Sequence, residues 1–249
     1  MLTAEYLLKG LIFICPRAKD FPRSSSSTAA GEELYCANLY IGGCSLIRHH
    51  MNMKRDLKDY TLVICAGEER YPDYTIKEAL MREKWDVITF QEHSLRSLEI
   101  CHFEPYLSEL IAYARELCPS AKIALHQSWG YGETKMHTMK SAGVASIEEM
   151  FDKAEENYLL ALENSDADFL IPSGKVLKRL WREGYNVHRD DQHTSIGIGR
   201  YALALTWMRK LTGRSAIGNS FRDFKSFVSR EEIEAAQRAV DDIVVPFKF

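Results

Sequence analysis

The sequence has no segment long and apolar enough to cross a membrane, and it has no excess of positive charge. No window of about 18 residues is both apolar and uncharged, which argues against a membrane-spanning helix. The run Tyr6–Cys15 is short and contains Lys9, so we expect no signal peptide either. The formal net charge is −3 in 249 residues. We therefore expect neither a nucleic acid nor a membrane as a partner.

Closely spaced cysteines are also missing. None of the six cysteines belongs to a CxxC pair, and apolar residues surround them. This pattern argues against a zinc ribbon and against a disulfide framework. We expect reduced, mostly buried thiols and a cytoplasmic protein.

Short apolar runs alternate along the chain with longer amphipathic segments. The runs typical of strands are Leu11–Cys15, Leu39–Ile41, Thr61–Cys65, Asp86–Phe90, Lys122–Leu125 and Asp168–Ile171. The segments with helical period are Glu104–Leu117, Ser146–Asn164, which opens with a capping box, Gly197–Leu211 and Ser229–Val244. Runs that do not alternate with polar residues are typical of strands buried on both faces of a parallel sheet. The chain is therefore predicted to form one α/β domain over residues 1–249, with a parallel sheet between two helical layers.

The segment Arg189–Ser195 carries the sharpest signal for chemistry. An Asp three residues before a His on one tight loop can accept a hydrogen bond from the imidazole, which leaves the other ring nitrogen as a general base. The pair is Asp190 and His193. The alternative is a solvated polar loop in which Asp191 or Thr194 caps the following helix.

Two further positions follow predicted strands and suit an oxyanion site. Gly43, in the pair Gly42–Gly43, would let backbone N–H groups approach a developing negative charge closely. Gln91 comes directly after the run Asp86–Phe90 and could supply a second donor through its amide. The alternatives are an ordinary turn at the glycines, and a helix cap or a solvent-facing side chain at Gln91.

The segment His126–Tyr131 places polar and aromatic side chains at the end of another predicted strand. His126 and Trp129 are candidates for substrate binding, because an aromatic ring suits the apolar face of a sugar. Ordinary packing is the alternative for the large aromatic residues.

A metal site is a further alternative for the polar loop. His188, Asp190 and His193 could in principle provide three zinc ligands. An acid–base pair explains the same residues, and the spacing from His188 differs from common metal motifs. We therefore expect no metal and no cofactor.

Five segments, taken in order, resemble the SGNH (GDSL-type) hydrolase superfamily, and within it a poorly characterised bacterial branch. They are NLYIGGCSL at 38–46, WDVITFQEHS at 85–94, HQSW at 126–129, IPSG at 171–174 and DDQHTS at 190–195. The resemblance runs from about Ala29 to the C-terminus. It implies a flavodoxin-like three-layer α/β/α sandwich and a Ser–His–Asp hydrolase of esters, often of acetyl groups on carbohydrates.

The resemblance also implies roles for individual residues. Asp190 and His193 match the acid and the base of the superfamily, and Gly43 matches its oxyanion glycine. Gln91 lies where the superfamily places its oxyanion amide, although the usual residue there is Asn.

The nucleophile block departs from the superfamily, and residues 1–28 are atypical as a whole. A Gly-Asp-Ser or Gly-Asn-Ser turn should follow the first strand, but Cys15-Pro16-Arg17 stands there instead. The other candidates for a nucleophile are Cys15 itself, a serine in the stretch Ser24–Ser27, and Ser220 in Gly218-Asn-Ser-Phe221.

Two functional hypotheses follow. The first is a serine hydrolase, an esterase or deacetylase, which removes an acyl group from a small ester or an acylated sugar. The second is a pseudoenzyme that binds a carbohydrate or acyl ligand without cleaving it. Because the expected serine is missing, we expect weak hydrolysis or none.

Overall fold

Strands and helices alternate through most of the chain, as the sequence predicts. The computed structural model describes residues 11–16, 34–64 and 69–249. The strands are β1 (Leu11–Pro16), β2 (Leu34–Tyr40), β3 (Tyr60–Ile64), β4 (Glu69–Tyr74), β5 (Val87–Phe90), β6 (Lys122–His126) and β7 (Phe169–Ile171). The helices are α1 (Leu46–Arg55), α2 (Ile76–Leu80), α3 (Tyr106–Leu117), α4 (Met136–Ser141), α5 (Ile147–Asn164), α6 (Ser173–Arg182), α7 (Ile198–Thr212) and α8 (Arg230–Ile243). Short 3₁₀ turns, η2 (Arg96–Leu98), η3 (Ile100–His102) and η4 (Glu133–Lys135), complete the loops.

The strands form one sheet in the order β4-β3-β2-β1-β5-β6-β7. The predicted parallel pairing is present between β5, β6 and β7. The other neighbouring pairs are antiparallel, including both pairs that β1 makes with β2 and β5. The sheet is therefore mixed, and the expectation of parallel pairing is wrong for its β1–β4 half. A buried apolar run covers its two faces equally well in either direction, so its composition does not specify the direction.

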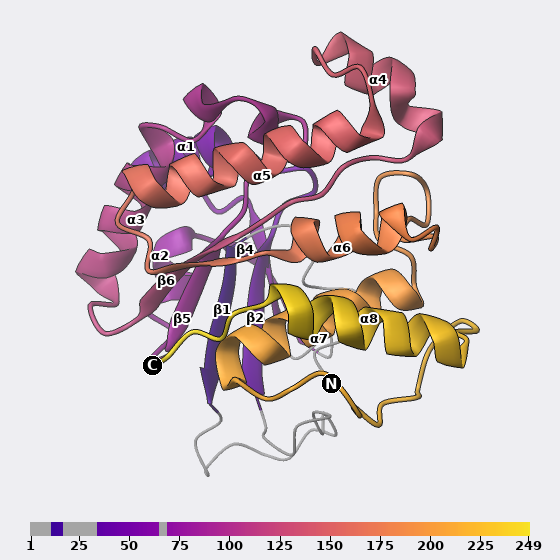
Figure 1. Cartoon of the computed structure of the whole chain (residues 1–249). Coiled ribbons are helices and arrows are strands. Elements are labelled where there is room, and N and C mark those ends of the chain that lie inside the picture. Colours follow the sequence, from indigo (N-terminus) through magenta and orange to yellow (C-terminus); the bar gives the residue numbers. More distant parts are fainter. Residues whose placement is uncertain (1–10, 17–33, 65–68) are drawn as a thin grey trace.

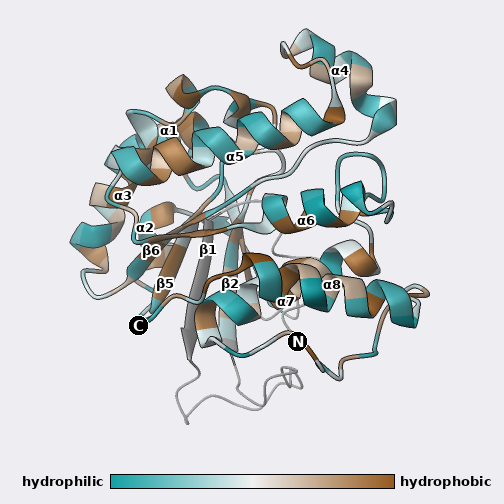
Figure 2. Cartoon of the chain, in the orientation of Figure 1, coloured by the Kyte–Doolittle hydropathy of each residue, from teal (hydrophilic) through white to brown (hydrophobic). Residues whose placement is uncertain are grey.

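Helices cover both faces of the sheet, which confirms the three-layer α/β/α architecture (Figure 1). One core lies between the sheet and helices α1, α2, α3 and α5, and it takes Ile88, Ile123 and Leu125 from the strands. On the opposite face, Val87 and Ala124 pack against Trp207 of α7. Helices α6, α7 and α8 and part of α5 enclose a further core. In Figure 2 the strands β5 and β6 are largely hydrophobic, while hydrophilic residues gather on the outer helices.

The helix ends follow their capping residues. Ser229 and Glu232 form a complete capping box at the start of α8. At the start of α5, the Ser146 hydroxyl accepts a hydrogen bond from the Glu149 N–H, as predicted. The Glu149 carboxylate, however, accepts from the N–H of Ala145 and not of Ser146, so the expected capping box is only half formed.

The predicted strands are all present, but one strand was not predicted. Strand β4 lies at the sheet edge, and all of its side chains are exposed or half-buried. A strand with no buried face lacks the apolar pattern on which the prediction depends. Strand β2 begins at Leu34, earlier than the predicted start at Leu39.

None of the helices that the structure describes is long and apolar enough to cross a membrane. Among the cysteines whose side chains the structure describes, Cys44 and Cys118 are buried, Cys36 is half-buried and Cys101 is exposed, and all four are free thiols. The prediction of mostly buried thiols therefore holds at Cys44 and Cys118 and fails at Cys101.

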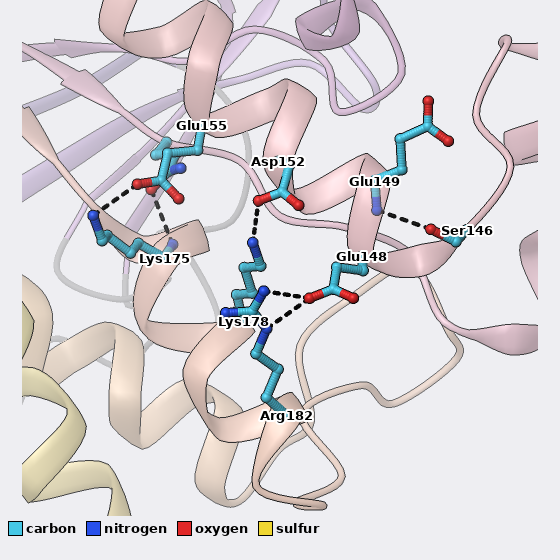
Figure 3. A network of polar contacts seen from close by, with 9 residues as sticks. Ser146, Glu148, Glu149, Asp152, Glu155, Lys175, Lys178 and Arg182 are labelled. Atoms are coloured by element: carbon cyan, nitrogen blue, oxygen red, sulfur yellow. Dashed lines mark hydrogen bonds and ion pairs between the residues drawn. The ribbon is translucent and has the colours of Figure 1, made fainter.

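Charged side chains connect α5 to α6, as Figure 3 shows. Lys178 of α6 is only 7% exposed and forms an ion pair with Asp152 of α5. Arg182 pairs with Glu148 one turn away, where both side chains are about half exposed. The first pair holds a buried charge, and the second lies at the surface.

We expect Asp152→Asn to lower the free energy of unfolding by about 1–2 kcal/mol, because it leaves the buried Lys178 ammonium without its carboxylate. Glu148→Gln is the matched control and should cost about 0.5 kcal/mol or less, as exposed ion pairs do. Urea unfolding of both variants measures the difference. Equal losses would show that the burial of Lys178 has no energetic consequence.

Candidate active site

The loops that follow β5, β6 and β7 are hydrogen-bonded to one another at the carboxyl edge of the parallel strands. The Gln127 N–H donates to the carbonyl of Ile171 at 3.1 Å, and its side-chain oxygen accepts from the N–H of Lys175 at 3.0 Å. The hydroxyls of Ser97 and Ser128 lie 2.9 Å apart. The polar segments that the sequence places after separate strands thus meet at one edge.

The loop Arg189–Ser195 is fastened to the loop after β6. Trp129 Nε1 donates to the Gln192 carbonyl at 3.1 Å, and the Gly132 N–H donates to the Asp191 carbonyl at 2.7 Å. Asp191 has a positive φ of 56°, and its carboxylate accepts from the Thr134 N–H at 2.8 Å. A Cβ on Gly132 would lie 2.3 Å from the Asp191 carboxylate, so only glycine fits there.

The alternative role of this loop, a cap from Asp191 or Thr194, is wrong. Asp191 bonds to Thr134, and Thr194 Oγ1 is buried without a hydrogen-bond partner among the described residues. The N-cap of α7 is Gly197, and the Ser195 hydroxyl, two residues before it, accepts from the Gly199 N–H of the first turn at 2.9 Å.

Asp190 and His193 form the predicted pair. His193 Nδ1 lies 2.9 Å and 3.0 Å from the two carboxylate oxygens of Asp190, and the His193 backbone N–H donates to Asp190 at 2.8 Å. A carboxylate only accepts, so Nδ1 carries a proton, and in the neutral ring Nε2 carries the lone pair. Partial burial raises the pKa of Asp190, but the hydrogen bonds from His193 outweigh it and hold the pKa well below the ordinary value. Asp190 is thus ionised at neutral pH and fixes one tautomer of the imidazole.

The residues proposed for substrate binding, His126 and Trp129, are both buried. Trp129 is 2% exposed and holds the Gln192 carbonyl, so it supports the loop of the acid–base pair. His126 is fully buried, and its Nε2 accepts from Trp207 Nε1 at 3.2 Å. Burial lowers the pKa of His126 to about 3, so its ring is neutral. Neither side chain presents a surface to a sugar in this structure.

Ser173 Oγ lies 2.9 Å from His126 Nε2, a distance that suits a nucleophile and its base. Both side chains are fully buried, and Trp207 donates to the same ring nitrogen. This serine therefore packs in the interior, where a substrate cannot reach it.

The two predicted oxyanion positions lie where β2 and β5 end. Gly43 is exposed in the turn between β2 and α1, and its φ of 63° favours glycine. Gln91 directly follows β5 and is 7% exposed. Its Oε1 is buried and has no hydrogen-bond partner in the described part of the chain.

Glu92, which the sequence analysis did not select, connects these two positions. Its Oε1 accepts from the N–H of Leu46, the first residue of α1, at 3.2 Å and from the His93 N–H at 2.6 Å. The sequence analysis selected its neighbour Gln91 instead. A single Glu in a polar segment has the pattern of a solvent-exposed residue, so nothing in the sequence marked Glu92.

The sequence pattern of a family described as a domain of unknown function, DUF4886, matches residues 25–243. The chain belongs to the DUF4886 family. A crystal structure of a DUF4886 family protein from Bacteroides uniformis ATCC 8492 is similar, with a TM-score of 0.74 and 27% sequence identity over 83% of this chain and 81% of that one. None of the curated proteins matches the chain.

The nucleophile candidates of this DUF4886 protein that the structure describes, Cys15 and Ser220, belong to other parts of the fold. A parallel β1 would put Cys15 at the same edge as the loops after β5, β6 and β7, but β1 is antiparallel to β5, so Ile14 pairs with Val87 at the start of β5. Cys15 therefore lies near the amino end of β5, whereas Gln91 lies at its carboxyl end. Cys15 also precedes the residues that match the family. The stretch Ser24–Ser27 lies outside the described residues.

Ser220 lies among the contacts between α7 and α8. It is exposed, and the preceding Asn219 accepts from Tyr201 of α7 while its carbonyl accepts from Gln237 of α8. The segment therefore holds two helices together, which accounts for its polar residues.

The zinc alternative is not supported in this DUF4886 protein. His188 Nε2 donates to the Gly130 carbonyl at 2.8 Å, and Asp190 bonds to His193. The possible ligand atoms of these three residues do not lie within 4.8 Å of one another, in contrast to those of the surface group Glu99, Cys101 and His102.

Proposed function

We propose that this DUF4886 protein is an ester hydrolase of the SGNH type, with His193 as general base and Asp190 as the residue that orients it. The observation that carries the proposal is that Asp190 accepts from both the backbone N–H and the Nδ1–H of His193. This arrangement leaves Nε2 as the basic atom of the ring.

In the proposed reaction, His193 Nε2 takes the proton of a hydroxyl nucleophile while the nucleophile's oxygen bonds to the acyl carbon. The developing oxyanion is held by the Gly43 N–H and the Gln91 amide. His193 then returns the proton to the leaving alcohol as the ester bond breaks. The substrate class is a small acyl ester or an acylated sugar, and the free thiols are consistent with a cytoplasmic setting.

We expect slow hydrolysis of p-nitrophenyl acetate that falls to background in His193→Ala and by about 100-fold in Asp190→Asn. The matched control is His137→Ala, because His137 is exposed on α4 and lies outside the loop. A loss of rate in His137→Ala would measure the nonspecific acetylation of a surface imidazole. Equal rates in the wild type, His193→Ala and His137→Ala would contradict the hydrolase.

A non-catalytic role is the second candidate, and the position of Cys15 favours it. In this role the site binds an acyl or carbohydrate ligand, and no nucleophile is needed beside His193. If all variants hydrolyse at the background rate, binding of an acetylated monosaccharide, measured by calorimetry with and without His193→Ala, tests this alternative.

A further inference from the structure

A buried carboxyl group lies between the two candidate oxyanion elements. Glu92 is 1% exposed and follows Gln91 at the end of β5. Its Oε1 bonds to the N–H of Leu46, which begins α1 directly after the turn that contains Gly43. The first N–H groups of a helix have no partner within the helix, so the carboxyl satisfies one of them and lies at the positive end of the helix dipole.

Helix α5 fixes the backbone of Glu92 from the other side. The Glu92 N–H and the Tyr158 hydroxyl lie 2.9 Å apart, and the Glu92 carbonyl lies 3.4 Å from the same hydroxyl. Tyr158 is fully buried. The main chain of Glu92 is thus fixed to α5, and the Glu92 side chain is fixed to the first residue of α1.

We propose that Glu92 is a positioning residue, whose carboxyl group sets the distance between the turn of Gly43 and the strand end of Gln91. The inference rests on the proposed function in assigning these two elements as oxyanion donors. Such donors must be fixed to within about 0.5 Å to stabilise a transition state. A single side chain bonded to one element and covalently next to the other meets this need.

The second oxygen of Glu92 makes the arrangement sensitive to protonation. Oε2 is buried and has no hydrogen-bond partner among the described residues. Burial raises the pKa of Glu92 to about 7, against the lowering effects of the His93 and Leu46 N–H groups and of Arg96. The ionised form accepts the stronger, charge-assisted hydrogen bonds, so the Gly43 turn is held more firmly above pH 7.

The neighbouring His93 carries an imidazole, which ordinarily changes charge in this range. The other groups that face Glu92 keep their charge. Burial raises the pKa of Cys44, in the turn before α1, to about 12, and it raises the pKa of Tyr158 on α5 as well. Arg96 on η2 carries a guanidinium, which stays charged at every pH of interest. A transition near pH 7 that Leu46 and Gly43 share, and that is lost with the Glu92 carboxyl group, therefore reports Glu92.

The test is a ¹H–¹⁵N NMR titration of the whole chain between pH 5.5 and 8.5. We expect the amide signals of Leu46 and Gly43 to shift together with one midpoint near pH 7. In Glu92→Gln this common transition should be lost. Glu78→Gln is the matched control, because Glu78 also accepts a backbone N–H at a helix start, in α2, and should leave the transition unchanged.

The wild-type titration stands by itself if Glu92→Gln does not fold. A Gly43 amide that does not follow Leu46 would overturn the positioning role, as would a shared Leu46 and Gly43 transition that persists in Glu92→Gln. The NMR readout does not depend on ester hydrolysis, so a chain that lacks hydrolase activity can still show the coupling. Conversely, activity that depends on His193 without the common transition would contradict the role of Glu92 alone.

Discussion

Replacing Gly174 with alanine is expected to destabilise the protein by about 3 kcal/mol, which corresponds to a fall in Tm of about 6–12 °C. The added Cβ would lie 2.1 Å from the backbone oxygen of Ser128 and 3.0 Å from the Gln127 side chain. Neither can withdraw freely, because the Gln127 N–H is bonded to the Ile171 carbonyl and its side chain to the Lys175 N–H. Either the start of α6 or the loop after β6 must move.

Gly184→Ala is the control for this prediction. Gly184 lies just beyond the other end of α6 and has open space around its Cα, but its φ of 88° is unfavourable for alanine. The cost there should be about 1 kcal/mol from the backbone alone. Thermal unfolding of the two variants separates steric overlap from backbone strain. A smaller loss at position 174 than at position 184 would show that the β6 loop yields to the new methyl group.

The acid–base pair could be predicted from the sequence because its geometry is local. Asp190 and His193 are three residues apart on one tight loop, so their contact needs no information about distant strands. The apolar runs that became β5, β6 and β7 were predictable for a similar reason. A strand buried on both faces shows its burial in its own composition.

The direction of β1 and the role of Glu92 could not be predicted in this way. An apolar strand such as Leu11–Pro16 packs equally well in either direction, and the direction decides at which sheet edge Cys15 lies. The position of Glu92 depends on Leu46 and Tyr158, which are 46 and 66 residues away along the chain. Trp129 was likewise selected as a ligand-binding aromatic residue, whereas its indole N–H supports the Gln192 carbonyl from the interior.

The second large effect is a change of stability with pH that depends on Glu92. Its pKa is about 7 in the folded chain and 4.5 ordinarily. Between these values the folded state binds more protons than the unfolded state, so the free energy of unfolding falls as pH rises. This loss of stability, which comes from ionising the buried Glu92 carboxyl group, is absent below the ordinary pKa and complete above pH 7. A difference of about 2.5 pKa units corresponds to about 3 kcal/mol.

Glu92→Gln removes this charge and keeps the shape of the side chain. We expect the variant to exceed the wild type in free energy of unfolding by about 3 kcal/mol at pH 8.5 and by about 1 kcal/mol at pH 5.5. Urea unfolding at the two pH values gives both differences. Glu78→Gln should act in the opposite direction, because the hydrogen bond from the Thr75 N–H and the contact with Lys58 lower the pKa of Glu78. A Glu92→Gln difference that is equal at both pH values would show that the carboxyl group stays ionised in the folded protein, held by the Leu46 and His93 N–H groups despite its burial.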